Sequence, residues 1–342
     1  MAVSPSSCRA SGQRVCPPYD RVMDRVAAIV AATNAPPTLA ACLKAIRASA
    51  EPPEQVIVVS EPAGQGPAAA RNRAAAQTTC ELLVFVDADV VVHPDAFVRI
   101  RQTFAENPGI AAVFGAYDDD PAEPNLVSGF RNLLHHHVHT RAAGPASTFW
   151  AGLGAIRATV FEELGGFDDR RYPSPSIEDI ELGARLHARG YSVLLDPGIQ
   201  GKHLKRWTLA SMIRTDFSKR GIPWAELVLA HESDARALNL GLRHRLSALA
   251  SVSLLVSLGL RRYRVAAASA AAFTALNRDF YVLVARRRGA AHAGGGLVLH
   301  VMHSLTATAA AVVAGWRHAG RRTRVQPGSR SSEKGAGKMR SE

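Results

Sequence analysis

The sequence predicts an α/β protein with a doubly wound, Rossmann-like mixed sheet, followed by C-terminal hydrophobic membrane helices. Three short apolar runs, Val26–Ala32, Gln55–Ser60 and Leu82–Val86, alternate with stretches of helical spacing, which is the rhythm of such a sheet. Charge divides the chain: residues 1–242 carry 24 Lys and Arg against 26 Asp and Glu, whereas residues 243–342 carry 17 against 3. The basic end therefore differs in kind from the predicted sheet.

The first apolar run favours a buried parallel strand, because no polar residue interrupts it before Thr33-Asn34. Apolar residues then recur at helical spacing over Thr38–Ser49, and Pro52-Pro53 ends that helix. Gln55–Ser60 is a second strand.

A second helix is expected over Ala68–Ala76, which carries Arg71. The third strand, Leu82–Val86, ends at Asp87. We expect a break at Pro121–Pro124 and a helix with a loop over residues 125–145.

These patterns divide the 342 residues into four parts. Residues 1–24 are polar and predicted to be a disordered N-terminus, and residues 25–242 form the α/β domain. Residues 243–320 form membrane-associated or transmembrane helices, and residues 321–342 form a disordered basic tail.

The net charge of +12 resembles that of a nucleic-acid-binding protein until its position is considered. All of the excess lies among the longest apolar runs, so an anionic membrane surface is the favoured partner and no nucleic acid is expected. Gly294–Trp316 is long enough to span a bilayer, whereas Leu246–Leu260 and Val265–Leu276 are too short. Basic residues flank each run, so some runs are expected to lie at the interface with arginines on lipid phosphates. The alternative is a soluble bundle of Ala-rich helices.

Three loops are predicted to meet in one crevice, because ligands of such sheets bind at the carboxyl ends of the strands. They are Thr33-Asn34, Ser60-Glu61 and Asp87-Ala88-Asp89. Two carboxylates after a buried strand need a positive partner. A divalent cation with oxygen ligands would supply it and could bridge to phosphate oxygens.

A second acidic pair, Glu178-Asp179, begins a predicted helix that Ser176 can cap. Acids in a first helical turn are common because they interact favourably with the helix dipole, so the pair is informative only in combination with the first motif. Two other clusters were weighed. Asp118-Asp119-Asp120 is expected to be a solvated loop, and the consecutive histidines His135–His137 point in different directions on a helix and do not converge on one metal ion.

The segments VAAIVAATN, VIVVSE, AARNRAA, VFVDADV, FWAGLGAIRATVFEELGGFD and EDIELGARLHARG, in this order, resemble a family 2 inverting glycosyltransferase with the GT-A fold, of the bacterial membrane-associated type. The resemblance covers roughly residues 26–225 and includes the family's DXD motif at Asp87–Asp89. It implies a nucleotide-sugar donor, a divalent metal and a single inverting displacement.

The resemblance also assigns roles by position. It implies Asp179, with Glu178 beside it, as the catalytic base. It implies that the metal is bound by Asp89, Asp87 and His203. The residues implied in donor binding are Thr33, Asn34, Glu61, Arg71, Asp87, Gly152, Gly154, Arg206 and Trp207. Ser60-Glu61 stands where a pair of Asp is common, which puts base recognition in doubt, and the Gln that usually precedes Arg206-Trp207 is not at its usual spacing.

The implied function is transfer of a sugar from a UDP-, GDP- or dTDP-linked donor to a lipid-linked or membrane-proximal glycan acceptor. Mn²⁺ or Mg²⁺ is the implied cofactor, and the expected location is the cytoplasmic membrane with the catalytic domain facing the cytosol. Three alternatives remain at this stage. They are a haloacid-dehalogenase-like phosphohydrolase, a nucleotidyltransferase and a catalytically inactive membrane adaptor. The first is considered because VFVDADV also resembles the DxD strand of such phosphohydrolases.

Overall fold

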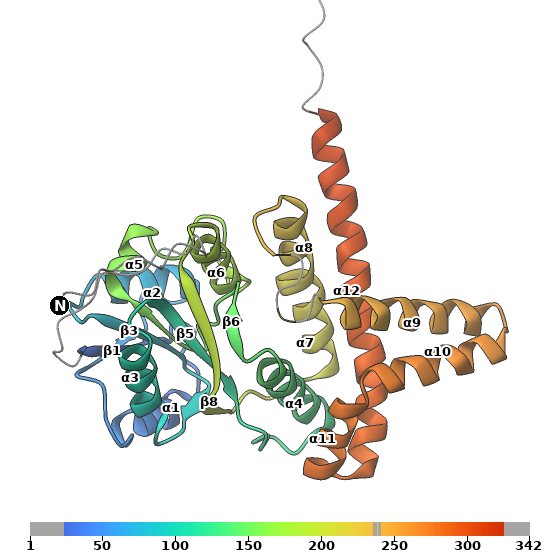
Figure 1. The fold of residues 1–342 in the computed structure, drawn as a ribbon, viewed down its shortest axis with the longest axis horizontal. Coiled ribbons are helices and arrows are strands. Elements are labelled where there is room, and N and C mark those ends of the chain that lie inside the picture. The colour runs from blue at the N-terminus through green and yellow to red at the C-terminus, as the bar shows by residue number, and fades with distance from the viewer. Residues whose placement is uncertain (1–23, 235–237, 239–240, 325–342) are drawn as a thin grey trace, which may run out of the picture.

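The computed structural model describes residues 24–234, residue 238 and residues 241–324. The disordered segments expected at residues 1–23 and 325–342 lie outside the described residues. Residues 25–234 contain the sheet and its helices, and the remainder is helical (Figure 1).

One mixed sheet forms the centre of the molecule, with strands in the order β2-β1-β3-β7-β5-β8-β4 and with β6 paired to β8. β1 pairs in parallel with β2 and β3, whereas β7 runs antiparallel to both β3 and β5. The bounds are β1 Val26–Ala31, β2 Gln55–Val59, β3 Leu82–Asp87, β4 Val90–Val92, β5 Ile110–Tyr117, β6 Gly144–Ala146, β7 Leu153–Arg157 and β8 Ser192–His203.

Helices cover both faces of this sheet, which explains the uninterrupted apolar runs. In β1, Ala27 and Ile29 pack on one face with residues of helices α2, α5 and α6. Val26, Ala28 and Val30 pack on the other face with residues of α1 and α3. A strand buried on both sides has no polar face, so alternation is lost.

The helices that cover the sheet or lie beside it are α1 Leu39–Arg47, α2 Pro67–Ala75, α3 Ala96–Glu106, α4 Leu126–Arg141, α5 Ala158–Glu163, α6 Glu178–Ala188, α7 Leu209–Arg214, the π-helix η1 Thr215–Gly221 and α8 Ile222–Leu229. The C-terminal helices are α9 Leu242–Gly259, α10 Tyr263–Leu276, α11 Arg278–Arg288 and α12 Ala290–Arg324. The first three strands and two helices lie where the sequence predicts them.

The predicted cap at the start of α6 is wrong. Ile177 occupies the N-cap position, and no side chain caps the helix. The Ser176 hydroxyl donates instead to the carbonyl of Lys219 in η1 at 2.7 Å, so it joins two elements that meet beside the acidic pair.

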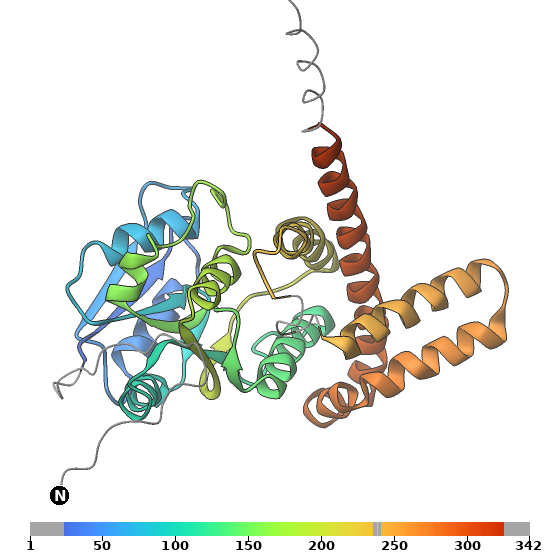
Figure 2. The same cartoon turned by 45° about the horizontal axis from the view of Figure 1, so that its top comes forward.

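The C-terminal helices fall into two groups (Figures 1 and 2). α11 and α12 pack against α4, α8 and η1 of the α/β domain. α9 and α10 pair with each other and extend away from the body as a hairpin that contacts α12 at its base. Among the described residues, Ala290–Gly320 of α12 is the one segment long and apolar enough to cross a membrane.

The expectation that residues 118–120 form a solvated loop is wrong. The Asp118 carboxylate lies 3.1 Å from Nε2 of His93, Asp119 pairs with Arg287 of α11, and Asp120 pairs with Lys202. Arg288 also donates to the carbonyl of Glu123 at 2.9 Å. The basic end of α11 therefore docks on an acidic side chain and a backbone carbonyl of the α/β domain, where opposite charge is available at short range.

Candidate functional site

The loops that follow β1 and β3 lie side by side, because the two strands are parallel neighbours with Ala31 opposite Asp87. The carboxyl ends of both strands thus open at the same edge of the sheet. β4 begins at Val90, so Asp87-Ala88-Asp89 forms the tight connection between two strands.

Arg71 joins this connection to the second acidic pair. Its Nη2 donates to Oδ1 of Asp87 at 2.6 Å, and its Nη1 donates to Oε1 of Glu178 at 3.0 Å. Burial alone would lower the pKa of Arg71, but Asp87 and Glu178 outweigh it and raise that pKa. Burial raises the pKa of Asp87 despite the guanidinium beside it. α2, β3 and the start of α6 are held together at this guanidinium.

The segment between Trp150 and Gly152 ties Asp179 to the same place. The backbone N–H of Ala151 donates to Oδ2 of Asp179 at 3.1 Å. The carbonyl of the next residue, Gly152, accepts from the backbone N–H of Asp87 at 3.0 Å. Asp87 and Asp179, which are 92 positions apart in the sequence, therefore share a two-residue support.

The two acids at the start of α6 have different surroundings. Glu178 pairs with the Arg71 charge and also accepts from the backbone N–H of Ser176 at 3.0 Å. The Asp179 carboxylate accepts only backbone N–H groups in the contacts recorded for it, those of Ala151 and Ile180. Burial raises the pKa of Asp179 to about 6, and the neighbouring Glu178 charge adds to this rise. Asp179 is therefore a stronger base than an ordinary aspartate.

Asp89 faces His203 on the other side of the connection. Oδ2 of Asp89 lies 3.6 Å from Nε2 of His203, which reaches the site because β8 pairs with β4 at Val90. Burial would raise the pKa of Asp89, but His203 and the charge of Lys205 outweigh it and lower that pKa. The Tyr117 ring stacks on His203 at 4.1 Å between ring centroids and 8° between planes, which holds the imidazole in one orientation.

The Asp89 and His203 pair fits a divalent cation by the chemistry of its donor atoms. A carboxylate oxygen and an imidazole nitrogen are both ligands for Mn²⁺-like ions. Within the part of the chain that the structure describes, no group of three or more His, Cys, Asp or Glu side chains has the spacing of a metal site. A cation here would need its remaining ligands from a bound substrate or from water.

The first two loops contact each other across the ends of β1 and β2. The buried Thr33 hydroxyl donates to the carbonyl of Gln65, and the Thr33 carbonyl accepts from the N–H of Gly64 at 2.9 Å. Glu61 accepts from the N–H of Ala63 at 3.0 Å. Asn34 is exposed at the loop surface. These contacts fix the loop backbones and leave the Asn34 side chain accessible.

Internal packing accounts for both glycines of the predicted donor loop. A Cβ at Gly152 would lie 2.3 Å from the Trp150 ring, and one at Gly154 would lie 2.3 Å from the Trp150 carbonyl oxygen. Any side chain at these positions would displace Trp150. That indole packs on Tyr117, which in turn stacks on His203. The need for glycine is therefore explained by the protein itself, without a ligand.

Arg206 and Trp207 lie next to α4. Trp207 is buried, and its backbone N–H donates to Oγ of Ser128 at 2.7 Å. Its indole lies between the charges of Lys205 and Arg131, at 4.5 and 5.1 Å from the ring centroid. Arg206 is 77% exposed, with Glu123 at 4.0 Å. Thus Trp207 packs in the protein interior, and Arg206 points to the loop before α4.

Sequence reasoning missed Lys205 and Tyr117. Lys205 follows His203 by two residues, and its charge acts on both Asp87 and Asp89. The basic run around His203 was a signal for it. Tyr117 gave no signal, because its contact with His203 depends on the pairing of β5 with β8. The histidines of α4 serve packing and backbone contacts: His139 Nδ1 lies 2.8 Å from the Gly115 carbonyl, and its ring lies 3.8 Å from that of His135.

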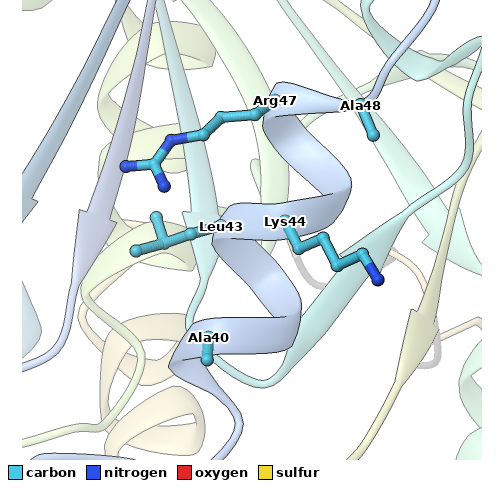
Figure 3. A pocket seen from close by; sticks show the side chains of 5 residues that line it. All are labelled: Ala40, Leu43, Lys44, Arg47 and Ala48. Carbon is cyan, nitrogen blue, oxygen red and sulfur yellow. The ribbon is translucent and has the colours of Figure 1, made fainter.

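A surface hollow on α1 is separate from these carboxylates. It encloses about 530 Å³ and is lined by side chains of one helix, Ala40, Leu43, Lys44, Arg47 and Ala48 (Figure 3). None of the site residues lines it, so we assign it no part in the chemistry.

Residues 43–165 match the family described as Glycosyl transferase family 2. Over these residues the chain is similar to family 2 glycosyltransferases. The match covers α1 to α5, including the Asp87–Asp89 connection and the Trp150–Gly152 segment. It replaces the phosphohydrolase and nucleotidyltransferase alternatives for this domain.

A characterised protein and a solved structure are also similar to this chain. The O-antigen biosynthesis protein RfbC of Myxococcus xanthus is 30% identical over 142 residues, which are 37% of this chain and 11% of that protein. The chain thus spans about a tenth of this relative. The mannosyltransferase PcManGT from Pyrobaculum calidifontis, solved in complex with GDP-Man and Mn²⁺, superposes with a TM-score of 0.51 at 19% identity over 90% of this chain and 91% of that one. This likeness shows that the domain has the GT-A fold.

Proposed function

We propose that this chain transfers a sugar from a nucleotide-sugar donor to an acceptor hydroxyl in a single inverting displacement. The observation that carries the proposal is the two-residue support: Ala151 binds Asp179, and Gly152 binds Asp87. It holds a basic carboxylate and the DXD connection at adjacent residues of one short backbone segment. A displacement at an anomeric carbon needs such a base opposite the departing group.

Asp89 and His203 would hold a divalent cation, Mn²⁺ or Mg²⁺, with Asp87 beside them. Such an ion, when bound, offsets the negative charge that develops on the departing diphosphate. The complex of PcManGT with GDP-Man and Mn²⁺ supports both a nucleotide-sugar donor and a metal for this chain. Lys205, whose charge acts on both DXD carboxylates, would add a positive charge at the same side of the cleft.

We assign the rest of the donor site to the loops at the sheet edge. Thr33, Asn34 and Glu61 would meet the nucleoside, and Arg71 would fix the position of Asp87. The backbone at Gly152 and Gly154 would face the transferred sugar. Arg206 and Trp207 lie toward α4, so we propose for them a place at the edge of the site, beyond Lys205.

Asp179 would act as the base. At pH 7 a carboxylate with a pKa of about 6 is mostly ionised. It would take the proton of the acceptor hydroxyl as that oxygen bonds to the anomeric carbon. The bond from this carbon to the diphosphate oxygen breaks with its electron pair, and the nucleoside diphosphate leaves. The acceptor is proposed to be a lipid-linked or membrane-proximal glycan at the cytosolic membrane face.

The test is Asp179→Asn. We expect a loss of at least about a hundredfold in kcat, with the KM for the donor retained, because a positioned base contributes about 10²–10⁴-fold. Release of free nucleoside diphosphate from UDP-, GDP- and dTDP-sugars with Mn²⁺ gives the measurement. Glu162→Gln, an exposed acid of α5, is the matched control and should keep full activity.

The same assay separates the two acids of α6. If Asp179→Asn turns over normally while Glu178→Gln is inactive, the base is wrongly assigned. A chain that releases no nucleoside diphosphate from any of the three donors would instead be a catalytically inactive adaptor.

A further inference from the structure

The α9–α10 hairpin has polar residues inside and apolar residues outside. Ser251, Ser257, Ser269 and Asn277 are buried between helices. The outward positions of α9 and its end carry large apolar side chains that are 36% or more exposed: Leu242, Leu246, Leu249, Leu255, Val256, Leu258 and Leu260. Water favours the opposite arrangement, and contiguous apolar exposure marks an interaction surface.

Hydrogen bonds between small polar side chains hold the hairpin together. Asn277 donates to Oγ of Ser247 at 3.0 Å, and the hydroxyls of Ser253 and Ser269 are 2.8 Å apart. Small polar residues between helices, with leucine and valine outside, are the packing pattern of helices in lipid. The surroundings for which this hairpin is built are therefore apolar.

The distribution of charged residues indicates which kind of apolar surroundings the hairpin contacts. Residues 235–278 contain no Asp or Glu. Arg243 and Arg245 lie at the base of the hairpin, and Arg261, Arg262 and Arg264 lie at its tip. Tyr263, among the tip arginines, is 65% exposed. Arginine and tyrosine beside leucine are typical of the boundary between lipid head groups and acyl chains.

α12 satisfies the length and composition criteria for a membrane span, but one of its faces is occupied by the catalytic domain. Nδ1 of His303 lies 2.8 Å from Oδ2 of Asp216 in η1. A Cβ at Gly221 would lie 2.6 Å from that of Ala310, so the two helices touch closely. Among the described residues, the hairpin has no such partner beyond its base, and it extends away from the body (Figures 1 and 2).

We propose that the α9–α10 hairpin, and not α12, is the element that enters an anionic phospholipid bilayer. The leucines of α9 enter the acyl region of one leaflet, and the arginines at both ends bind the lipid phosphates of that leaflet. α9 is 18 residues long, a rise of about 27 Å, which would nearly cross the hydrocarbon core. A crossing would put three arginines on the far side, against the charge asymmetry of membrane proteins. The proposal gives the membrane location in the proposed function a structural basis, and it requires no assumption about catalysis.

The test uses the full chain and sedimentation with vesicles of phosphatidylglycerol and phosphatidylcholine, or of phosphatidylcholine alone. We expect the protein to pellet with the anionic vesicles. The triple variant Leu249→Asn, Leu255→Asn and Leu258→Asn should lose at least about a hundredfold in vesicle affinity, since each buried leucine contributes to the partition. These side chains are outside every core, so the variant should fold and melt as the wild type does.

Two further variants complete the design. Arg261→Gln, Arg262→Gln and Arg264→Gln together should abolish the preference for anionic over neutral vesicles. Val312→Asn, on the exposed side of α12, is the control and should leave binding unchanged. Unchanged binding by the leucine variant, or loss of binding by the Val312 variant alone, would overturn the proposal. The proposal would also be overturned if the wild type does not bind vesicles and instead forms a dimer that the leucine variant dissociates. Nucleoside diphosphate release is measured in parallel without lipid, so that failure of the catalytic proposal is seen separately.

Discussion

One guanidinium holds the acidic residues of the site in place. Arg71 is buried and reaches Asp87 and Glu178, which are 91 positions apart in the sequence. Removing it would leave Glu178 as an unpaired buried charge, and such losses cost about 3–5 kcal/mol. Arg71 therefore holds these two carboxylates in position, in addition to any contribution to donor binding.

This role predicts the behaviour of Arg71→Met. We expect the free energy of unfolding to fall by about 3 kcal/mol or more, together with loss of activity. Denaturant unfolding followed by circular dichroism measures the change. Arg73→Met, from the same helix, should change stability by less than about 1 kcal/mol, because Arg73 donates to the Glu61 backbone at an exposed place. Equal effects of the two variants would contradict the structural role of Arg71.

The surroundings of Asp179 predict the pH dependence of the reaction. The base must be ionised to take a proton, and its pKa is raised to about 6. Hence kcat/KM should fall as pH decreases through about 6 and should be level above about 7. A pH–rate profile measured at saturating Mn²⁺ checks this. A rate that stays constant from pH 7 down to pH 5 would exclude Asp179 as the titrating base.

At the residue scale, the sequence was informative where geometry follows from topology. Acids after β3 had to lie beside the β1 loop, because parallel strands end at one edge. The contact of Arg71 with Glu178 spans 107 positions and depends on where α6 packs, which no local pattern records. Gly152 and Gly154 were predicted to bind the donor, and the structure explains glycine at both positions by their close contact with Trp150.

At the scale of elements, the docking of α12 on η1 is one of the contacts that join the two parts of the chain. Asp216 is buried in η1 between Arg131 of α4 and His303 of α12. A π-helix is rare and frequently marks a functional position. Here the π-helix carries the Asp216 charge, which contacts two other helices. The backbone carbonyl of Lys219, in the same π-helix, accepts from Ser176 beside the acidic pair.

Asp216→Asn should therefore release α12. Burial would raise the pKa of Asp216, but Arg131 and His303 outweigh it and lower that pKa to about 2. A carboxylate with a lowered folded-state pKa stabilises the fold above its unfolded value, near 4, and this contribution is lost as pH falls toward 2. The wild type should melt higher than Asp216→Asn at pH 6, and the gap should shrink between pH 4 and 2. A constant gap would show that the ionised carboxylate is not the cause.

The arrangement of these helices was the least predictable part of the chain. Apolar runs at 246–260, 265–276 and 294–316 were recognised as helices, but their composition does not record their partners. Arginines that flank some apolar runs were expected at lipid phosphates, but Arg287 and Arg288 contact Asp119 and the Glu123 carbonyl. A basic run can pair with lipid phosphates or with polar groups of the protein, so only the tertiary structure shows which of the two it contacts.

At the scale of the whole molecule, the chain combines a near-neutral catalytic domain with a basic helical end. The sheet order was within reach of sequence reasoning for its first three strands. The antiparallel insertion of β7 between β3 and β5 was not, because β7 is a short apolar segment that fits either direction.

Donor binding should stabilise this whole molecule. We expect a nucleotide sugar of the correct base to raise the melting temperature when Mn²⁺ is present, by about 2.7 kcal/mol of stability at a hundred times its Kd. A thermal-shift screen of UDP-, GDP- and dTDP-sugars identifies the base. Excess chelator should remove both the shift and the activity, and added Mn²⁺ should restore them. A shift that persists in chelator would remove the metal from the donor site.

The hydroxyls of Ser251 in α9 and Ser304 in α12 lie 3.1 Å apart, and α12 is fastened in turn to η1. The α9–α10 hairpin is thus connected to the candidate site through the rigid helix α12 and not through a flexible linker. If the α9–α10 hairpin is embedded in lipid, α12 would fix the distance of Asp179 from the bilayer. The length of an acceptor, as well as its chemistry, would then decide whether its hydroxyl reaches Asp179.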